Sequence, residues 1–173
     1  MRVFISLELP EIVKKEIVKI QKIFSKDFSG KITSTKNLHL TLKFIGEISE
    51  ETVEKIKEKL RKIKFNEFSA EIDSVGVFSE DFIRIFWVHL NGCSELQKAI
   101  DEELSDLFEK EKRFMSHITI ARIKNCDKDE FLSKIKSFKV NPVKFIVKDF
   151  YLKNSVLKSD GPTYFTIEKF SAG

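Results

Sequence analysis

The sequence predicts an α+β fold built from two copies of one βαβαβ unit, and three observations support this prediction. The same order of strands and helices is expected in each half of the 173-residue chain. A His-x-Thr pattern with aliphatic flanks occurs at His39–Thr41 and returns at His117–Thr119. The two patterns lie 78 positions apart, and the strand-like segments around Val3 and Ile83 lie 80 apart. Such a nearly constant offset predicts an internal duplication.

The first half is expected to contain two helices between three strands. Pro10 ends an alternating, β-rich segment and is tolerated in the first turn of the helix that follows. Ser49 is an N-cap candidate with acidic residues directly after it, which suits a helix N-terminus. The expected elements are a strand over 2–9, a helix over 11–24, a polar loop over 31–36, the first histidine strand to about 45, a helix to about 63 and extended chain over 65–78.

The second half repeats this order. Asn91–Gly92 closes its first strand, and Ser94 is expected to cap the helix that follows. The expected elements are a strand over 82–90, a helix over 94–108, the second histidine strand over 114–123, a helix over 127–138, a strand over 143–152 and a last strand over 163–170. We therefore expect one bilobal domain over 1–173, with pseudo-symmetric halves of about 1–80 and 81–173.

Composition restricts the class of protein. The chain is 42% hydrophobic and 34% charged, and its longest apolar runs are short, which is typical of a soluble protein without a membrane span. Its first residues lead straight into a strand and show no secretory leader, so we expect a cytoplasmic location. Cys93 and Cys126 show no disulfide or zinc-site spacing. The net charge of +4 permits a polyanionic partner without requiring one.

The two His-x-Thr patterns carry the chemistry. Residues i and i+2 of a strand project from one face, so each copy presents an imidazole beside a hydroxyl. In a duplicated frame His39 and His117 would face each other, and two imidazoles can act as an acid–base pair near neutral pH. The hydroxyls suit a phosphate, which has several oxygen acceptors. The alternative is two half-buried histidines on unrelated strands. His89 has no threonine partner and is expected to be a surface or structural histidine.

The residues around both patterns resemble a known family. The runs His39–Glu47 and His117–Arg122 are similar to those of the two-histidine phosphoesterases, specifically the LigT-like RNA 2′,3′-cyclic phosphodiesterases, also called 2′-5′ RNA ligases. Smaller similarities complete the resemblance over the whole chain, and they lie at Arg2–Ile5, Gly76–Phe78, Trp87, Ser155–Leu157 and Gly161–Tyr164.

The resemblance implies two antiparallel sheets around a central cleft, with helices outside. It implies metal-independent hydrolysis of RNA or nucleoside 2′,3′-cyclic phosphate to a 2′-phosphate without a cofactor, and a reverse, ATP-independent 2′-5′ ligation. The hypothesis makes His39 the proton donor and His117 the proton acceptor, with Thr41 and Thr119 beside them, although the pseudo-symmetry leaves this division of roles open. The implied partners are RNA ends or nucleotides with a cyclic phosphate, tRNA halves being one candidate; a monomer and no membrane are expected.

Two alternative functions stay open. One is a phosphodiesterase for a small nucleotide, such as ADP-ribose cyclic phosphate or a 2′-5′ oligonucleotide. The other is a module that binds a nucleotide in the cleft without turnover. Retention of both histidines and both threonines counts against the second.

Five further residues are candidates for substrate binding. Lys43 shares the parity of His39 and should point into the cleft, toward phosphate or RNA backbone, with an ordinary lysine at the rim as the alternative. Strict alternation places Arg122 on the face opposite His117, where it would support the site without contacting substrate, unless the strand bulges. Phe4 and Arg84 match at the 80-residue offset, which makes Phe4 a candidate for base stacking, with core packing as the alternative, and Arg84 a candidate for phosphate contact. Tyr164 is expected at the rim.

Overall fold

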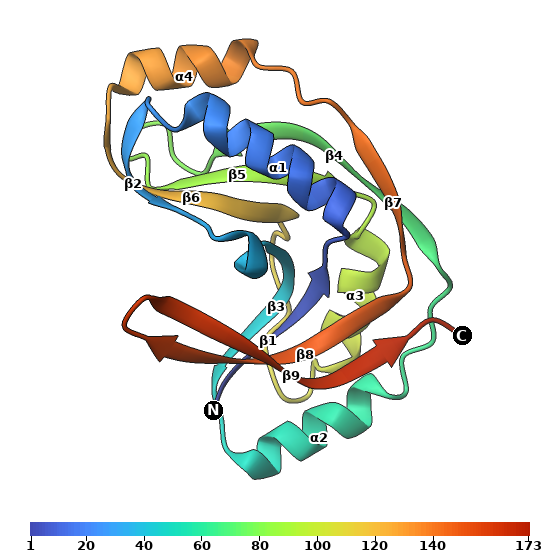
Figure 1. Cartoon of the computed structure of the whole chain (residues 1–173). Coiled ribbons are helices and arrows are strands. Elements are labelled where there is room, and N and C mark those ends of the chain that lie inside the picture. The colour runs from blue at the N-terminus through green and yellow to red at the C-terminus, as the bar shows by residue number, and fades with distance from the viewer.

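Four helices pack against two antiparallel sheets in the computed structural model, which describes all 173 residues (Figure 1). The predicted α+β class is confirmed. In chain order the elements are β1 (Arg2–Glu8), α1 (Glu11–Phe24), β2 (Phe28–Ile32), the 3₁₀ turn η1 (Thr35–Asn37), β3 (His39–Glu47), α2 (Glu50–Leu60), β4 (Phe68–Val77), β5 (Ile85–Asn91), α3 (Ser94–Glu103), β6 (His117–Cys126), α4 (Lys128–Ser137), β7 (Val143–Val147), β8 (Asp149–Lys158) and β9 (Gly161–Ser171).

Each sheet contains one histidine strand and draws strands from both halves of the chain. The first sheet has the order β3-β1-β8-β9, and the second has the order β2-β6-β5-β4-β7. Thus β4 of the first half lies beside β5, and β8 of the second half lies beside β1. The helices cross over in the same way, because α1 packs near β6 and β7 while α3 packs near β3 (Figure 1). The two halves are therefore interlocked.

The two histidine strands have the same register against their neighbours. Opposite Glu8 and Ser6 on β1 lie His39 and Thr41, and opposite His89 and Trp87 on β5 lie His117 and Thr119. Equivalent residues of β1 and β5 are therefore 81 positions apart in the sequence, whereas those of β3 and β6 are 78 apart. One consequence is that the structural equivalent of Phe4 is Ile85.

Both histidine strands also contain a β-bulge directly after the threonine. In β3 the pairing with β1 skips Leu42, and in β6 the pairing with β5 skips Ile120. An extra residue in one strand reverses the alternation of faces beyond it. In accord with this, Leu42 and Ile120 are each followed by a second buried residue and then by an exposed one.

Several element boundaries differ from the sequence-based predictions. Residues 143–152 form two strands of different sheets, separated at Lys148, because the chain crosses between sheets without a Gly or Pro to signal the break. The predicted loop before the first histidine strand contains part of β2. This strand lies at the edge of its sheet and pairs with β6. At Gly30 of this strand an added Cβ would lie 2.1 Å from the carbonyl oxygen of Arg122, so the close approach needs glycine.

Helix starts were predictable where a side chain caps them. The Ser49 hydroxyl accepts a hydrogen bond from the backbone N–H of Thr52 at 3.2 Å, as expected of an N-cap. Ser94 is wrong as a cap, since Cys93 occupies the N-cap position of α3 and makes no capping bond. A single apolar core joins both sheets and all four helices. None of these helices combines the length and the apolar character needed to cross a membrane.

Candidate active site

His39 lies at the start of β3 and is held through both ring nitrogens. Its Nδ1 lies 2.7 Å from the carbonyl oxygen of Asn37, and its Nε2 lies 3.0 Å from the Thr41 hydroxyl. Because a carbonyl can only accept, Nδ1 carries the proton in the neutral ring and Nε2 is the acceptor. The Thr41 hydroxyl then donates to Nε2, so this pair of residues presents a hydrogen-bonded imidazole and hydroxyl on one face.

His117 repeats this arrangement at the start of β6. Its Nδ1 donates to the carbonyl of Met115 at 2.8 Å, again two residues back along the chain. The same tautomer follows, with Nε2 as the unprotonated nitrogen. This Nε2 has no hydrogen-bond partner in the protein, so it is available to water or substrate. Thr119 lies on the same face and is partly exposed.

The charge of His117 acts on His39. Strands β3 and β6 lie close together in space, although they belong to different sheets (Figure 1). Burial lowers the pKa of His39 from its ordinary 6.5; the hydrogen bond to Asn37 opposes this effect, and the charges of Lys153 and His117 add to it. Burial likewise lowers the pKa of His117, opposed by its bond to Met115. Both rings are therefore neutral at pH 7. An acid–base pair needs at least one neutral ring, because only a neutral imidazole can accept a proton.

Aromatic rings surround His39. Its ring centroid lies 5.2 Å from that of Phe4 and 5.1 Å from that of Tyr164, and Tyr164 also packs edge-on against Phe4. Phe4 is only 4% exposed. It therefore has little free surface for stacking a base, and its packing holds the imidazole in place. Tyr164 is half-buried beside His39 rather than at an outer rim.

A different aromatic residue accompanies His117, and sequence reasoning did not single it out as functional. Phe78 lies edge-on against the imidazole with centroids 4.7 Å apart, and it is 52% exposed. Trp87 supports it at 6.0 Å and lies over Gly76, where an added Cβ would come within 2.4 Å of the indole. The Gly76–Phe78 segment followed by Trp87 was the available signal.

The bulges decide the side-chain directions of Lys43 and Arg122. Beyond Leu42 the faces of β3 reverse, so Lys43 points into the core, where it is 3% exposed and its Nζ lies 2.5 Å from Asp101 Oδ1. The prediction that Lys43 points into the cleft is wrong. Beyond Ile120 the faces of β6 reverse as well, and Arg122 returns to the face of His117. Arg122 also acts on Tyr164 of the first sheet. Burial raises the pKa of Tyr164, and the positive charge of Arg122 opposes this effect.

Arg84 does not take the position predicted for it. Its guanidinium donates to the carbonyls of Ile123 and Lys124, at 3.3 and 2.7 Å, and lies over the Phe82 ring. The predicted match with Phe4 rested on an offset of 80 residues, whereas the register gives 81. Arg84 therefore anchors the end of β6, and its guanidinium is committed to backbone oxygens.

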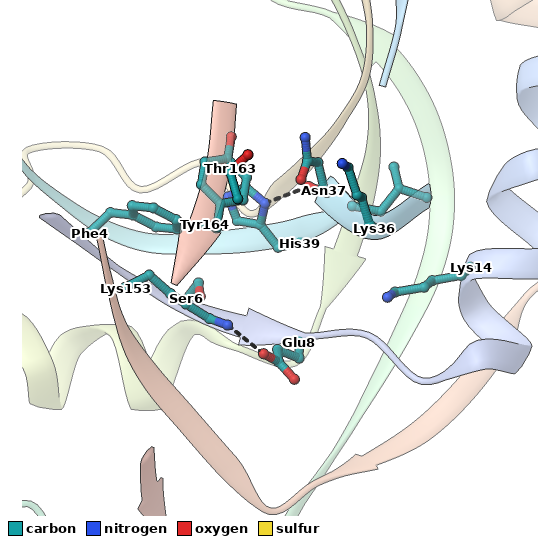
Figure 2. Close-up of a pocket in the computed structure, with 11 residues that line it drawn as sticks. Phe4, Ser6, Glu8, Lys14, Lys36, Asn37, His39, Lys153, Thr163 and Tyr164 are labelled. Atoms are coloured by element: carbon teal, nitrogen blue, oxygen red, sulfur yellow. Dashed lines mark hydrogen bonds and ion pairs between the residues drawn. The ribbon is translucent and has the colours of Figure 1, made fainter. Parts of the chain in front are cut away.

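A cavity of about 220 Å³ adjoins His39 (Figure 2). Phe4, Ser6 and Glu8 line it from alternate positions of β1, and Tyr164 closes one side. Three lysines also border it, namely Lys14, Lys36 and Lys153.

On the other side of the site, His89 lies opposite His117 in the strand pairing. Its Nδ1 is held by Asp73 at 2.7 Å.

Comparisons with known proteins agree with this fold and site. Residues 7–87 and 90–164 match the model of a family described as LigT like Phosphoesterase. An RNA 2′,3′-cyclic phosphodiesterase of Methanocaldococcus jannaschii is 36% identical, and the match covers 98% of this chain and 100% of that protein. An RNA 2′,3′-cyclic phosphodiesterase of Archaeoglobus fulgidus is 30% identical, and the match covers 98% of this chain and 99% of that protein. The crystal structure of TT0787 from Thermus thermophilus superimposes with a TM-score of 0.82 at 28% identity, covering 99% of this chain and 97% of the other. The chain belongs to the LigT-like phosphoesterase family.

Proposed function

We propose that this protein hydrolyses the 2′,3′-cyclic phosphate at the end of an RNA or on a nucleoside to a 2′-phosphate. The observation that carries the proposal is the matched pair of histidines on neighbouring strands of two sheets. Each has its Nδ1 fixed by the carbonyl two residues back and a threonine two residues ahead. The relatives from Methanocaldococcus jannaschii and Archaeoglobus fulgidus are named for this reaction.

The proposed step uses one nitrogen from each ring. A water molecule attacks phosphorus while Nε2 of His117 accepts its proton, and the bond from phosphorus to the 3′ oxygen breaks. The 3′ oxygen takes a proton from Nε2 of His39. His39 must be protonated for this role, and a bound phosphate anion favours that state because an opposite charge raises the pKa of a histidine. The free Nε2 of His117 suits the base, which supports this division of roles.

Cations and hydroxyls would stabilise the charge on phosphorus. Thr41 and Thr119 lie beside the two imidazoles, and Arg122 lies on the same face of β6 as His117. A guanidinium can contact two phosphate oxygens at once. Donors fixed in this way stabilise developing charge without reorganising during the step. Tyr164 and Phe4 would keep the His39 ring in position.

The remaining parts of the proposal concern partners and location. We infer that the chain acts as one domain over 1–173, in the cytoplasm and as a monomer, on RNA ends such as tRNA halves or on nucleotides with a cyclic phosphate. It needs no metal or other cofactor in this scheme. The reverse reaction, with an RNA 5′-hydroxyl in place of water, would give a 2′-5′ linkage without ATP.

The test is hydrolysis of nucleoside 2′,3′-cyclic phosphates by the purified protein with a chelator present. We expect turnover with the 2′-phosphate as the only product, because His39 protonates the 3′ oxygen. A 3′-phosphate product would contradict the assigned orientation. Tight binding without turnover would instead favour a nucleotide-binding module.

A further inference from the structure

The cavity beside His39 has the chemistry of an anion site. Its three lysines come from separate elements, with Lys14 on α1, Lys36 on η1 and Lys153 on β8 (Figure 2). Glu8 is the only carboxylate that lines it, and it pairs with Lys153 at 2.5 Å. Because Glu8 is paired with Lys153, the lining offers no carboxylate to Lys14 or Lys36. The lining therefore carries a net positive charge, with three lysines against one carboxylate.

A buried hydroxyl in the same cavity also lacks a partner. Ser6 is 1% exposed and lines the cavity, and its Oγ makes no hydrogen bond. Buried polar groups in proteins are nearly always paired, so an unpaired one calls for a ligand or a water molecule. The Thr163 hydroxyl is a second polar group of the lining. Oxygen atoms of an anion would satisfy both the hydroxyls and the lysines.

The size of the cavity limits what enters it. At about 220 Å³ it is smaller than the roughly 300–1,000 Å³ of ordinary small-molecule sites. It suits a phosphate group with part of its sugar and is too small for a whole additional nucleotide. It also adjoins the reacting centre, because His39 is part of its lining.

The covalent structure of ribose indicates which phosphate this is. The 3′ carbon is bonded to the 4′ carbon, which bears the 5′ carbon and its phosphate, whereas the 2′ carbon is bonded to the 1′ carbon, which bears the base. If His39 faces the 3′ oxygen, the 5′ phosphate of the terminal nucleotide leaves the site on the side of His39. The base leaves on the side of His117, where the exposed ring of Phe78 lies.

We propose that this cavity is a subsite for the phosphodiester on the 5′ side of the terminal nucleotide. Lys14, Lys36 and the Ser6 hydroxyl bind its oxygens, and Lys153 adds charge while it stays paired with Glu8. This inference rests on the proposed function and deepens it. It makes RNA ends of at least two nucleotides better substrates than a single nucleoside cyclic phosphate.

The experiment compares a dinucleotide ending in 2′,3′-cyclic phosphate with the corresponding nucleoside cyclic phosphate. For the unmodified protein we expect kcat/KM to be about tenfold or more higher for the dinucleotide, and this advantage should shrink with added salt. The double variant Lys14→Gln/Lys36→Gln should lose most of the advantage and keep its rate on the nucleoside. The matched control Lys15→Gln/Lys26→Gln removes the same charge from exposed positions outside the cavity, and should keep the advantage.

Two results would overturn the subsite: equal kcat/KM for both substrates, or an equal loss on both substrates in Lys14→Gln/Lys36→Gln. Binding of the two products, the dinucleotide and nucleoside 2′-phosphates, measures the subsite without turnover. If the protein hydrolyses neither substrate but binds the dinucleotide product more tightly through Lys14 and Lys36, the proposed function fails and the subsite stands. If the protein hydrolyses both substrates and binds both products equally, the proposed function stands and the subsite fails.

Discussion

Lys43 and Asp101 form an ion pair in the core, with Nζ 2.5 Å from Oδ1 and both side chains less than 10% exposed. Lys43 also donates to the carbonyl of Glu109, and Asp101 accepts from the backbone N–H of Glu111. The pair therefore ties the strand of His39 to the segment that leads into the strand of His117. Although burial opposes ionisation, the hydrogen bonds from Lys43 and Glu111 hold the pKa of Asp101 below its ordinary value.

Breaking this pair should destabilise the protein. Lys43→Met leaves the Asp101 carboxylate buried without its counter-charge, which costs about 3–5 kcal/mol in the free energy of unfolding. Lys43→Met/Asp101→Leu removes both charges and should recover most of the loss. Urea denaturation of the three proteins measures this. A single variant as stable as the unmodified protein would show that the pair contributes nothing.

The two histidines should also make stability depend on pH. Burial lowers both pKa values in the folded state, so the unfolded chain binds more protons once the pH falls below the ordinary histidine value of 6.5. The two histidines therefore make their full contribution to the free energy of unfolding above about pH 6.5. This contribution is lost as the pH falls through their pKa values in the folded state. Urea denaturation between pH 5 and pH 8 should show this decline, and His39→Gln/His117→Gln should flatten it. An identical decline in the variant would assign the effect to other groups.

The same lowered pKa values predict an acidic optimum for the reaction. The dependence of kcat/KM on pH reports the acid and base of the free enzyme. We expect a bell-shaped profile whose maximum lies below about pH 6.5, with activity lost at higher pH as the donor histidine deprotonates. Initial rates with a nucleoside cyclic phosphate at low substrate concentration measure it. A rate that keeps rising above pH 8 would be incompatible with a histidine donor.

Arg122 and Arg84 should differ in their effects. Arg122→Gln removes an exposed cation on the face of His117 and should lower kcat by about 10²-fold, with little change in stability. Arg122→Lys should restore only part of the activity because it lacks the bidentate geometry. Arg84→Gln is the control, since this guanidinium binds backbone carbonyls; it should act on thermal stability rather than on kcat. The reverse pattern would exchange the two roles.

The difference between these arginines also shows what could be read from the sequence. The His-x-Thr patterns and their offset predicted two related strands, because a period of two and a repeated order of elements are local signals. The face of Lys43 beyond Leu42 was predicted wrongly, and the face of Arg122 beyond Ile120 stayed conditional on a bulge, since a bulge depends on how the neighbouring strand pairs. The exchange of β4 and β8 between sheets is likewise a property of packing, and no residue in either strand signals it.

The central claim is that His39 and His117 act together on one cyclic phosphate, and single substitutions test it most directly. With chelator present, His39→Ala and His117→Ala should each lower kcat for a nucleoside 2′,3′-cyclic phosphate by about 10²–10⁴-fold. His89→Ala, the third histidine, should stay within about threefold of the unmodified protein, since its Nδ1 is held by Asp73 and it transfers no proton in the proposed step. Near-normal hydrolysis by a folded His39→Ala or His117→Ala protein would contradict the account.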